Sequence, residues 1–167
     1  ADDIKPSTVW ALVFSLAGIF LYILFRFRKW QYSAGCVAAS IHNVIVVCGA
    51  FALLHGVLPF SMQIDQTFVA AILTVIGYAL NDNVIVFDRI REEIRNNPRK
   101  DVDMLSNMAI NKTLSRTINT SLTTFLVVLV IFIWGGDSIR GFMFAIGIGI
   151  IVGTYSSIFT ATPVMLD

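Results

Sequence analysis

The sequence predicts an all-α integral membrane protein, a bundle of five transmembrane helices with a cytoplasmic amphipathic helix between the third and the fourth. The 167 residues are 56% hydrophobic and only 14% charged, with a mean hydropathy of +0.77, whereas soluble domains carry about 25% charged residues. The apolar residues gather in stretches long enough for a helix to cross a bilayer, which takes roughly 20 residues. This composition excludes a soluble enzyme, a disordered tail and a nucleic-acid binder.

Five apolar stretches are the expected spans. None alternates apolar and polar residues as the strands of a membrane barrel do, and helices satisfy their own backbone hydrogen bonds in lipid. We therefore expect one transmembrane bundle over residues 1–167, with helices at about 9–25, 35–58, 67–87, 117–134 and 141–166 and a cytoplasmic loop at 88–114.

The lysines and arginines predict the orientation, because they favour the cytoplasmic side. Only Lys5 and Arg140 fall on the outer side, and Arg116 lies at the edge of the fourth helix. We expect the N-terminus outside and the C-terminus inside. The other nine of the twelve fall on the inner side: Arg26, Arg28, Lys29, Arg89, Arg91, Arg95, Arg99, Lys100 and Lys112.

The inner segment after the third span has helical patterns of its own. Arg89 and Glu93, four residues apart, continue the third helix out of the membrane, and the residues 96–98, Asn-Asn-Pro, stop it. Asp101 can cap a new helix, which we expect to lie along the inner membrane surface. The apolar face of this helix would comprise Val102, Leu105, Met108 and Ala109. The basic residues here are explained by the inside-positive bias alone.

Asp82 is the most informative residue, because it lies within the third span, where a carboxylate costs about 2.5–3.5 kcal/mol at the bilayer centre. Arg116 is its expected partner, since the third and fourth helices run in opposite directions and place the two residues at depths that agree within a turn. Two roles remain open for the pair: a fixed polar clamp, or a switch in which Asp82 gains and loses a proton.

Further polar residues are expected to support this pair. Tyr78 and Asn81 precede Asp82, and His42-Asn43 interrupts the second helix near its middle. The fourth helix carries a polar stripe at helical spacing, which we expect to face Asp82. The stripe consists of Arg116, Asn119, Thr120, Thr123 and Thr124.

Small residues recur every four positions along the fifth helix, which is typical of close helix packing. The residues 117–134 are the candidate partner helix. The small residues are Gly141, Ala145, Gly149, Gly153 and Ser157. No phosphate-binding loop and no cluster of histidines and cysteines with metal-ligand spacing occurs, so we expect no enzyme activity, no cofactor and no metal site.

Three segments carry a resemblance to a known family. Gly77–Glu92, Leu114–Ser121 and the stretch from Ile139 to Phe159 resemble the signatures of the SecF family, the partners of SecD in bacterial protein export. The resemblance implies a six-helix protein with an extracytoplasmic domain between its first two helices. This chain is similar to helices two to six only, so we expect it to be a piece that lacks the first helix and that domain.

The resemblance also implies a function. SecF proteins belong to the resistance–nodulation–division superfamily and are understood to use the proton-motive force to help move secretory preproteins through the SecYEG channel of the bacterial inner membrane. It implies SecD, separate or fused, as a partner, along with membrane lipid and no nucleic acid. Asp82 and Arg116 fall where the family's intramembrane charged pair lies, and the resemblance places proton coupling there.

The chain departs from its relatives at two positions. Many relatives have His-Asp where this chain has His42-Asn43, which removes one carboxylate, and Asn83 replaces a more usual threonine or serine. The sequence leaves open whether protons or sodium ions drive the cycle. It also leaves two other functions open, a proton-driven exporter of lipids or small molecules and a structural scaffold subunit.

Overall fold

The structure, a computed structural model, describes the backbone of residues 4–167 and the side chains of residues 6–167. The side chain of Lys5, which we expect on the outer side, lies outside this described part. The described chain is helical throughout apart from its connections, in the order α1 Ile4–Phe27, α2 Trp30–Leu54, α3 Gln66–Asn96, α4 Val102–Trp134, α5 Asp137–Ser156, a π-helical turn η1 Ser157–Ala161, and α6 Thr162–Leu166.

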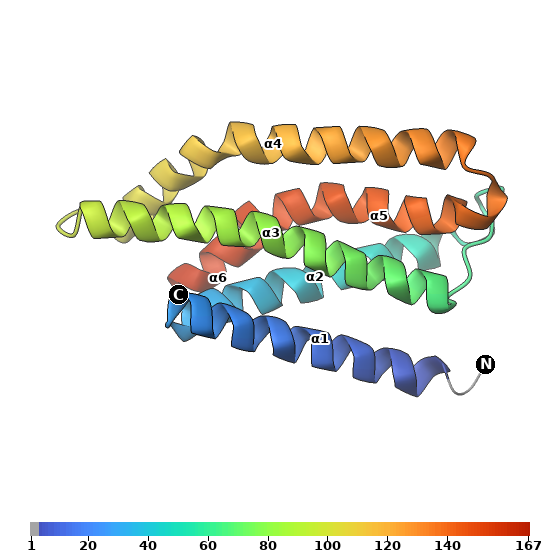
Figure 1. Cartoon of the computed structure of the whole chain (residues 1–167), viewed down its shortest axis with the longest axis horizontal. Helices are drawn as coiled ribbons and strands as arrows, with labels where there is room; N and C mark the ends of the chain where they lie inside the picture. Colours follow the sequence, from blue (N-terminus) through green and yellow to red (C-terminus); the bar gives the residue numbers. More distant parts are fainter. Residues whose placement is uncertain (1–3) are drawn as a thin grey trace.

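Five helical stretches of this described part are long and apolar enough to cross a membrane, with α5, η1 and α6 forming the fifth. This confirms the predicted number of spans. The start of α1 and the end of α6 lie at opposite ends of the bundle, as five crossings require (Figure 1). The α1–α2 turn and the α3–α4 connection share one end, which we call the charged end because most of the lysines and arginines lie there (Figure 1).

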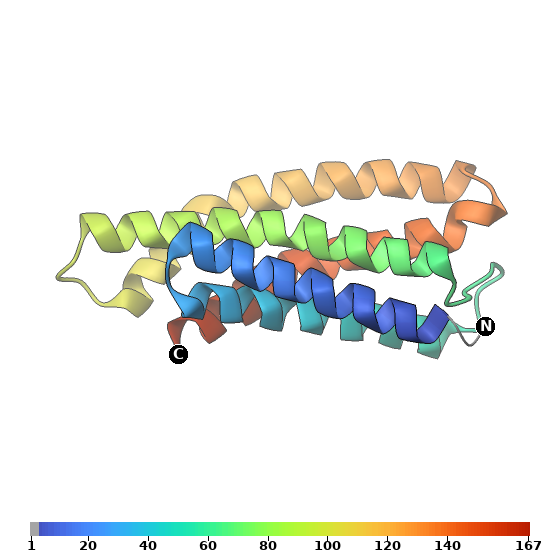
Figure 2. The same cartoon turned by 60° about the horizontal axis from the view of Figure 1, so that its bottom comes forward.

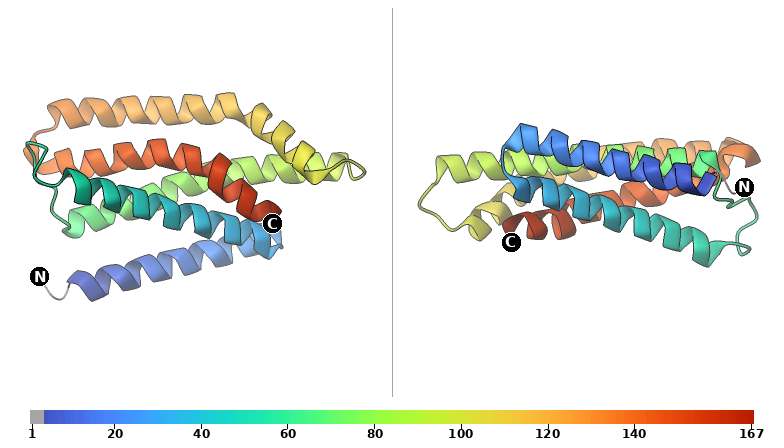
Figure 3. Two further views of the ribbon diagram at one scale, coloured as in Figure 1. Left: turned by 180° about the vertical axis from the view of Figure 1, so that it is seen from behind. Right: turned by 90° about the horizontal axis from the view of Figure 1, so that it is seen from below.

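The fifth stretch is the centre of the bundle. α5 packs against α2, α3 and α4, whereas α1 packs mainly on α2 (Figure 3). Two apolar clusters hold these helices together. One surrounds Phe87 near the charged end and includes Ile23 and Phe27 of α1, and the other surrounds Phe51 and Ala145 toward the opposite end.

The helix boundaries differ from the predicted ones at α2, which spans residues 30–54 rather than 35–58. Its first turn is ordered by Tyr32, whose ring stacks on Phe27 at 4.8 Å between centroids and contacts Phe87 edge-on at 5.2 Å. Its end is set by Gly56, whose φ of +81° lies in the left-handed region that an α-helix does not continue through.

The predicted end of the third helix and the predicted cap at Asp101 are confirmed. α3 continues beyond the apolar stretch and ends at Asn96, and the Asp101 side chain accepts a hydrogen bond from the Met104 amide at 3.4 Å. Asp65 also caps the start of α3, by accepting a bond from the Phe68 amide at 2.9 Å.

The expected separate helix along the membrane surface is not confirmed. The residues 102–112 are the first turns of α4, which runs to Trp134 without a break in its helical assignment and bends on the way (Figures 1 and 2). Leu105 and Ala109 are buried as the pattern predicts, and Ala109 packs in one apolar cluster with Ile90 of α3, whereas Val102 is exposed. Part of this apolar face is therefore covered by α3.

Candidate functional site

Asp82 lies in the interior of the bundle. Its side chain is 1% exposed, and its Oδ2 atom has no hydrogen-bond partner among the described residues. α3 carries it there because Ala79 and Val86, about one turn before and one turn after, also face the interior and are buried. A buried carboxyl group without a partner is costly when charged, so this residue is not explained by packing alone.

Two contacts fix the register between α3 and α4. Near the middle of the bundle the Tyr78 hydroxyl donates to Thr124 Oγ1 at 3.5 Å, and near the charged end Lys112 Nζ donates to Glu93 Oε1 at 2.6 Å. Interpolating between these contacts places Asp82 level with Ser121. Arg116 is five residues closer to the charged end, a displacement of about 7 Å along the helix.

Arg116 therefore does not form an ion pair with Asp82 in this structure. Its side chain is exposed and lines a cavity of about 490 Å³ between α3 and α4 at the charged end. Within the described part of the chain, neither Asp82 nor Arg116 takes part in an ion pair. The cavity is lined by Ile85, Asp88, Arg89, Glu92, Lys112, Thr113 and Arg116.

The predicted polar stripe of α4 lies at the edge of the helix pair rather than in its interior. Asn119 and Thr123 are exposed, and the Thr120 hydroxyl donates to the Arg116 carbonyl at 2.9 Å, within its own helix. Thr124 reaches α3, through Tyr78. The hydroxyls of α4 that do face the interior recur about one turn apart, and they were not predicted from the sequence. They belong to Thr113, Thr117 and Ser121.

Asn43 and Asn83 bring two further buried amides close to Asp82. A Cβ added to Gly153 would lie 3.1 Å from the Ala79 Cβ and 3.7 Å from the Asn43 Nδ2 atom, so α2, α3 and α5 meet at Gly153. Asn83 follows Ala79 by one turn on the same face of α3. Asn43 has no hydrogen-bond partner among the described residues, the Asn83 amide lies beside the Cys36 thiol without a hydrogen bond of good geometry, and both asparagines are fully buried.

We call Asn43, Asp82, Asn83 and Thr117 the buried polar set, since each is at most 2% exposed and has an unpartnered side-chain atom. Of the other predicted residues, Asn81 is exposed and points away from this set. His42 is half-buried, with its ring 6.3 Å from that of Tyr155. Unpartnered buried polar groups are ordinarily satisfied by internal water or a ligand, so the set marks a polar interior within an apolar bundle.

Two of the small residues, Gly149 and Gly153, pack against α3, so the predicted partner helix at residues 117–134 is wrong for them. An added Cβ on Gly149 would overlap the Val75 side chain, and Gly153 meets Ala79. The helix α4 instead approaches Gly147. Gly141 lies against the connection before α3, where an added Cβ would be 2.6 Å from the Ser61 carbonyl oxygen, and Ala145 and Ser157 are fully buried. Ser157 begins the π-helical turn.

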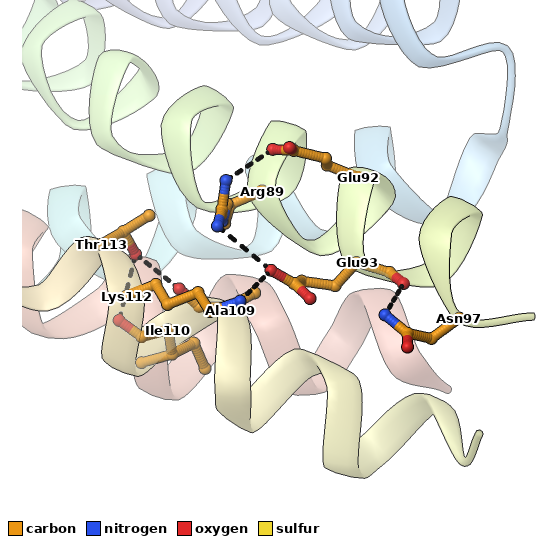
Figure 4. Close-up of polar contacts among 8 residues, drawn as sticks. All are labelled: Arg89, Glu92, Glu93, Asn97, Ala109, Ile110, Lys112 and Thr113. Atoms are coloured by element: carbon orange, nitrogen blue, oxygen red, sulfur yellow. Dashed lines mark hydrogen bonds and ion pairs between the residues drawn. The ribbon is translucent and has the colours of Figure 1, made fainter.

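A second charged group lies where α3 leaves the apolar stretch (Figure 4). Glu93 is 5% exposed and pairs with Lys112 at 2.6 Å and with Arg89 at 3.2 Å, while Arg89 also bonds Glu92 at 2.7 Å. The predicted four-residue pairing of Arg89 with Glu93 is thus confirmed. The Lys112 hydrogen bond, with the nearby positive charges, lowers the pKa of the Glu93 carboxyl below its ordinary value. Among residues 4–167 no group of three or more histidine, cysteine or acidic side chains could hold a metal ion.

Comparisons with known proteins agree with this architecture. The family described as "Protein export membrane protein SecD/SecF, C-terminal" matches residues 1–167. The chain is 52% identical over 167 residues to a protein translocase subunit SecF of Rhodothermus marinus, and this match covers 100% of the chain and 54% of that protein. It is 42% identical over 167 residues to a protein translocase subunit SecDF of Brucella abortus, of which it covers 21%.

Solved structures give the same result for the fold. A crystal structure of SecDF from Thermus thermophilus, described as a translocon-associated membrane protein, matches 97% of this chain with a TM-score of 0.85 at 40% identity, and the match covers 22% of that protein. SecDF in its super-membrane-facing form matches 99% of this chain with a TM-score of 0.86 at 39% identity. The chain spans about half the length of the SecF relatives it matches.

Proposed function

Because the chain belongs to the SecD/SecF family of protein-export membrane proteins, we propose that it is the membrane-embedded part of a translocase subunit that uses the proton-motive force. In this proposal the subunit lies in the bacterial inner membrane with its N-terminal end outside and its C-terminal end inside. It works with SecD, fused or separate, and with the SecYEG channel to move secretory preproteins. It needs no cofactor and catalyses no covalent chemistry.

The observation that carries the proposal is the isolation of Asp82. The carboxyl group is buried on α3, which packs against α2, α4 and α5, and Oδ2 has no hydrogen-bond partner among the described residues. A side chain in this environment is accommodated at lowest cost when it is neutral, and it requires a nearby cation when it is charged. The buried polar set supplies hydrogen-bonding groups around it but no compensating charge.

Arg116 is the cation that the charged form of Asp82 would attract. It lies about 7 Å closer to the charged end, in the cavity between α3 and α4. A fixed clamp would hold the two groups in contact, so their separation supports the switch over the clamp. We propose that loss of the proton draws Arg116 toward Asp82, that proton uptake releases it, and that α3 and α4 repack between these two states.

The same geometry explains how a movement of α4 could be transmitted beyond the bundle. α5 packs closely on α3 at Gly149, which leaves no room for a larger side chain, and at Gly153, so α3 and α5 are expected to move together. α4 is joined to α5 near Asp82 by one hydroxyl pair, Ser121 and Thr154, at 2.6 Å. The α4 contact is therefore the one that can change, and in the whole protein the movement would pass to the parts that this chain does not include.

Replacement of Asp82 by asparagine tests the proposal. In cells whose only copy of the full-length parent carries Asp82→Asn, we expect secretory precursors to accumulate while the membrane abundance of the parent stays normal. Asparagine preserves shape and hydrogen bonding but cannot ionise. Asp103→Asn is the matched control, because it removes an exposed carboxylate at the start of α4, and normal precursor processing is expected.

Each other outcome decides between the alternatives. Normal processing in Asp82→Asn would contradict the switch, and loss of abundance would indicate a scaffold role. Lost transport of a lipid or small molecule with intact protein export would indicate an exporter. Export that follows the sodium gradient, with the proton gradient collapsed, would assign the same carboxylate to sodium instead of protons.

A further inference from the structure

We propose that the corner between α1 and α3 at the charged end binds the headgroup of an anionic phospholipid. The corner is a cavity of about 300 Å³ that adjoins the cavity containing Arg116, with Asp88 and Glu92 lining both. Its lining residues come from the last turn of α1 and from the part of α3 beyond the apolar stretch: Arg26, Asp88, Arg91, Glu92 and Arg95.

The two helices are fixed to one another immediately beside this corner. Phe27 of α1 meets Phe87 of α3 edge-on at 6.1 Å between ring centroids, and both are buried. Arg26 directly precedes Phe27, and Asp88 directly follows Phe87. Arg26 donates to Asp88 at 3.0 Å, and its guanidinium lies 5.4 Å from the centroid of the Phe27 ring. The position of Arg26 is therefore set by the protein, and a guanidinium has further N–H donors to offer after one bond to Asp88.

The charges of the corner do not cancel. Asp88 is paired with Arg26, and Glu92 is paired with Arg89, which lies outside the cavity. Arg91 and Arg95 are exposed, lie one turn apart on α3, and take part in no ion pair within the described part of the chain. Two arginines on one face of a helix thus have no acidic partner, which is the requirement for binding an anion at this position.

Exposed apolar side chains of α1 lead up to the corner from the membrane side. Leu21, Tyr22 and Phe25 are exposed, and Phe25, which is 90% exposed, directly precedes Arg26 of the corner. Acyl chains contact these residues in the membrane, so a lipid headgroup is the anion that already lies beside the corner. A phospholipid matches both parts, since its phosphate faces the arginines and its acyl chains cover the apolar side chains.

The inside-positive bias explains why cations are numerous at this end, but it requires no particular arrangement of them. Arg99 and Lys100 show the difference, because they are equally exposed and lie in the connection between α3 and α4, outside the cavity. In the corner, arginines from two helices converge on one cavity beside exposed apolar side chains. Arg99 and Lys100 therefore provide a control with the same change in net charge.

Trp30 makes the proposal measurable, because it is 61% exposed and follows Arg26 by four residues across the α1–α2 turn. The experiment uses the full-length parent with every tryptophan except Trp30 replaced by phenylalanine, in phosphatidylcholine vesicles. Brominated phosphatidylglycerol or brominated phosphatidylcholine is added, and quenching of Trp30 reports which lipid occupies the corner. We expect stronger quenching by the brominated phosphatidylglycerol.

The variants separate the corner from the general surface charge. The double variant Arg91→Ala/Arg95→Ala is expected to reduce the preference for phosphatidylglycerol by about five-fold for each arginine removed, up to complete loss of the preference. The double variant Arg99→Ala/Lys100→Ala is expected to retain it. Equal loss in both variants would overturn the proposal in favour of a diffuse surface potential.

Two further results would also overturn it. Absence of quenching by either lipid would mean that another part of the parent protein covers the corner. Loss of the phosphatidylglycerol preference on adding inorganic phosphate at constant ionic strength would assign the corner to a soluble anion. Neither result depends on whether Asp82 couples export to protons, so this proposal stands or fails separately from the proposed function.

Discussion

Asp82 and Glu93 are two buried carboxylates on one face of α3, three turns apart, and they differ in their surroundings. Glu93 accepts from Lys112 and pairs with Arg89, whereas Asp82 forms no ion pair with any residue that the structure describes. The cations that α4 offers to them, Lys112 and Arg116, are one turn apart. The register between the helices closes the first pair at 2.6 Å and leaves the second open.

In the proposed switch, this difference decides which of the two carboxylates changes its protonation state. Replacing the carboxylate of the closed pair is expected mainly to lower the stability of the fold, because this pair holds α3 and α4 together at the charged end. A carboxylate without a partner contributes little to holding the helices. It is free to respond to protonation, and it is also the one that lies in the apolar part of the bundle.

The largest contrast is expected between Arg116→Ala and Lys112→Ala. Without Arg116 the charged form of Asp82 has no cation to attract, so precursors should accumulate as strongly as in Asp82→Asn, at normal abundance of the parent. Lys112→Ala breaks the closed pair, so it should lower the temperature of unfolding, with export falling only in proportion to the protein that remains. Pulse-labelled precursor processing and immunoblotting of membranes measure both effects.

The comparison would be broken if the two variants behaved alike. Equal loss of abundance would mean that both pairs are structural, and equal loss of export would mean that Lys112 belongs to the same switch. Arg116→Lys refines the result, because it keeps the charge on a shorter and less extended group; partial export is expected from it.

The next effect concerns stability and pH at Glu93, which lies beyond the apolar stretch that ends at Phe87. Its pKa is lowered from the ordinary value of 4.5, so the pairing stabilises the folded state above that value and is lost as the pH falls through the lowered pKa. We expect Glu93→Gln to lower the unfolding temperature at neutral pH by a few degrees and to flatten its fall on acidification. Scanning fluorimetry of the purified parent from about pH 7 to about pH 3 measures this.

Glu92→Gln is the matched control for that experiment, because Glu92 is more exposed and bonds only Arg89 within the described part of the chain. A smaller drop in unfolding temperature is expected from it, as exposed ion pairs contribute little. An unchanged acid profile in Glu93→Gln would mean that other carboxylates dominate acid unfolding, and the contrast with Asp82 would then rest on export alone.

Much of the fold could be predicted because its signals are local. The five spans, the end of α3 at Asn96 and the Asp101 cap each depend on residues close together in sequence. The pairing of Arg89 with Glu93 is equally local, being one turn of one helix. Asp82 could be singled out for the same reason, since a carboxylate within an apolar span is visible without any knowledge of its neighbours.

Two features could not be predicted from the sequence, for two physical reasons: which face of α4 is buried, and that Asp82 and Arg116 are not in contact. Lipid is as apolar as the bundle interior, so apolar patterning does not indicate which side of α4 is buried. Threonine hydroxyls can bond their own helix, as Thr120 and Thr123 do, and so they tolerate exposure to lipid. A depth estimate accurate to one turn also leaves about 5 Å undetermined, which is more than separates a closed ion pair from an open one.

The smallest expected effect is at Ser121, which is level with Asp82 and bonds Thr154 of α5 at 2.6 Å. Interhelical hydrogen bonds in membranes contribute about 0.6 kcal/mol on average, so Ser121→Ala should lower stability by about that amount and leave precursor processing intact. Unfolding of the purified parent in a graded denaturing detergent measures the change, with Thr123→Ala, which breaks only bonds within α4, as the control. Strong precursor accumulation in Ser121→Ala would instead make this hydroxyl a partner of Asp82, and the carboxylate would no longer be the isolated one of the two.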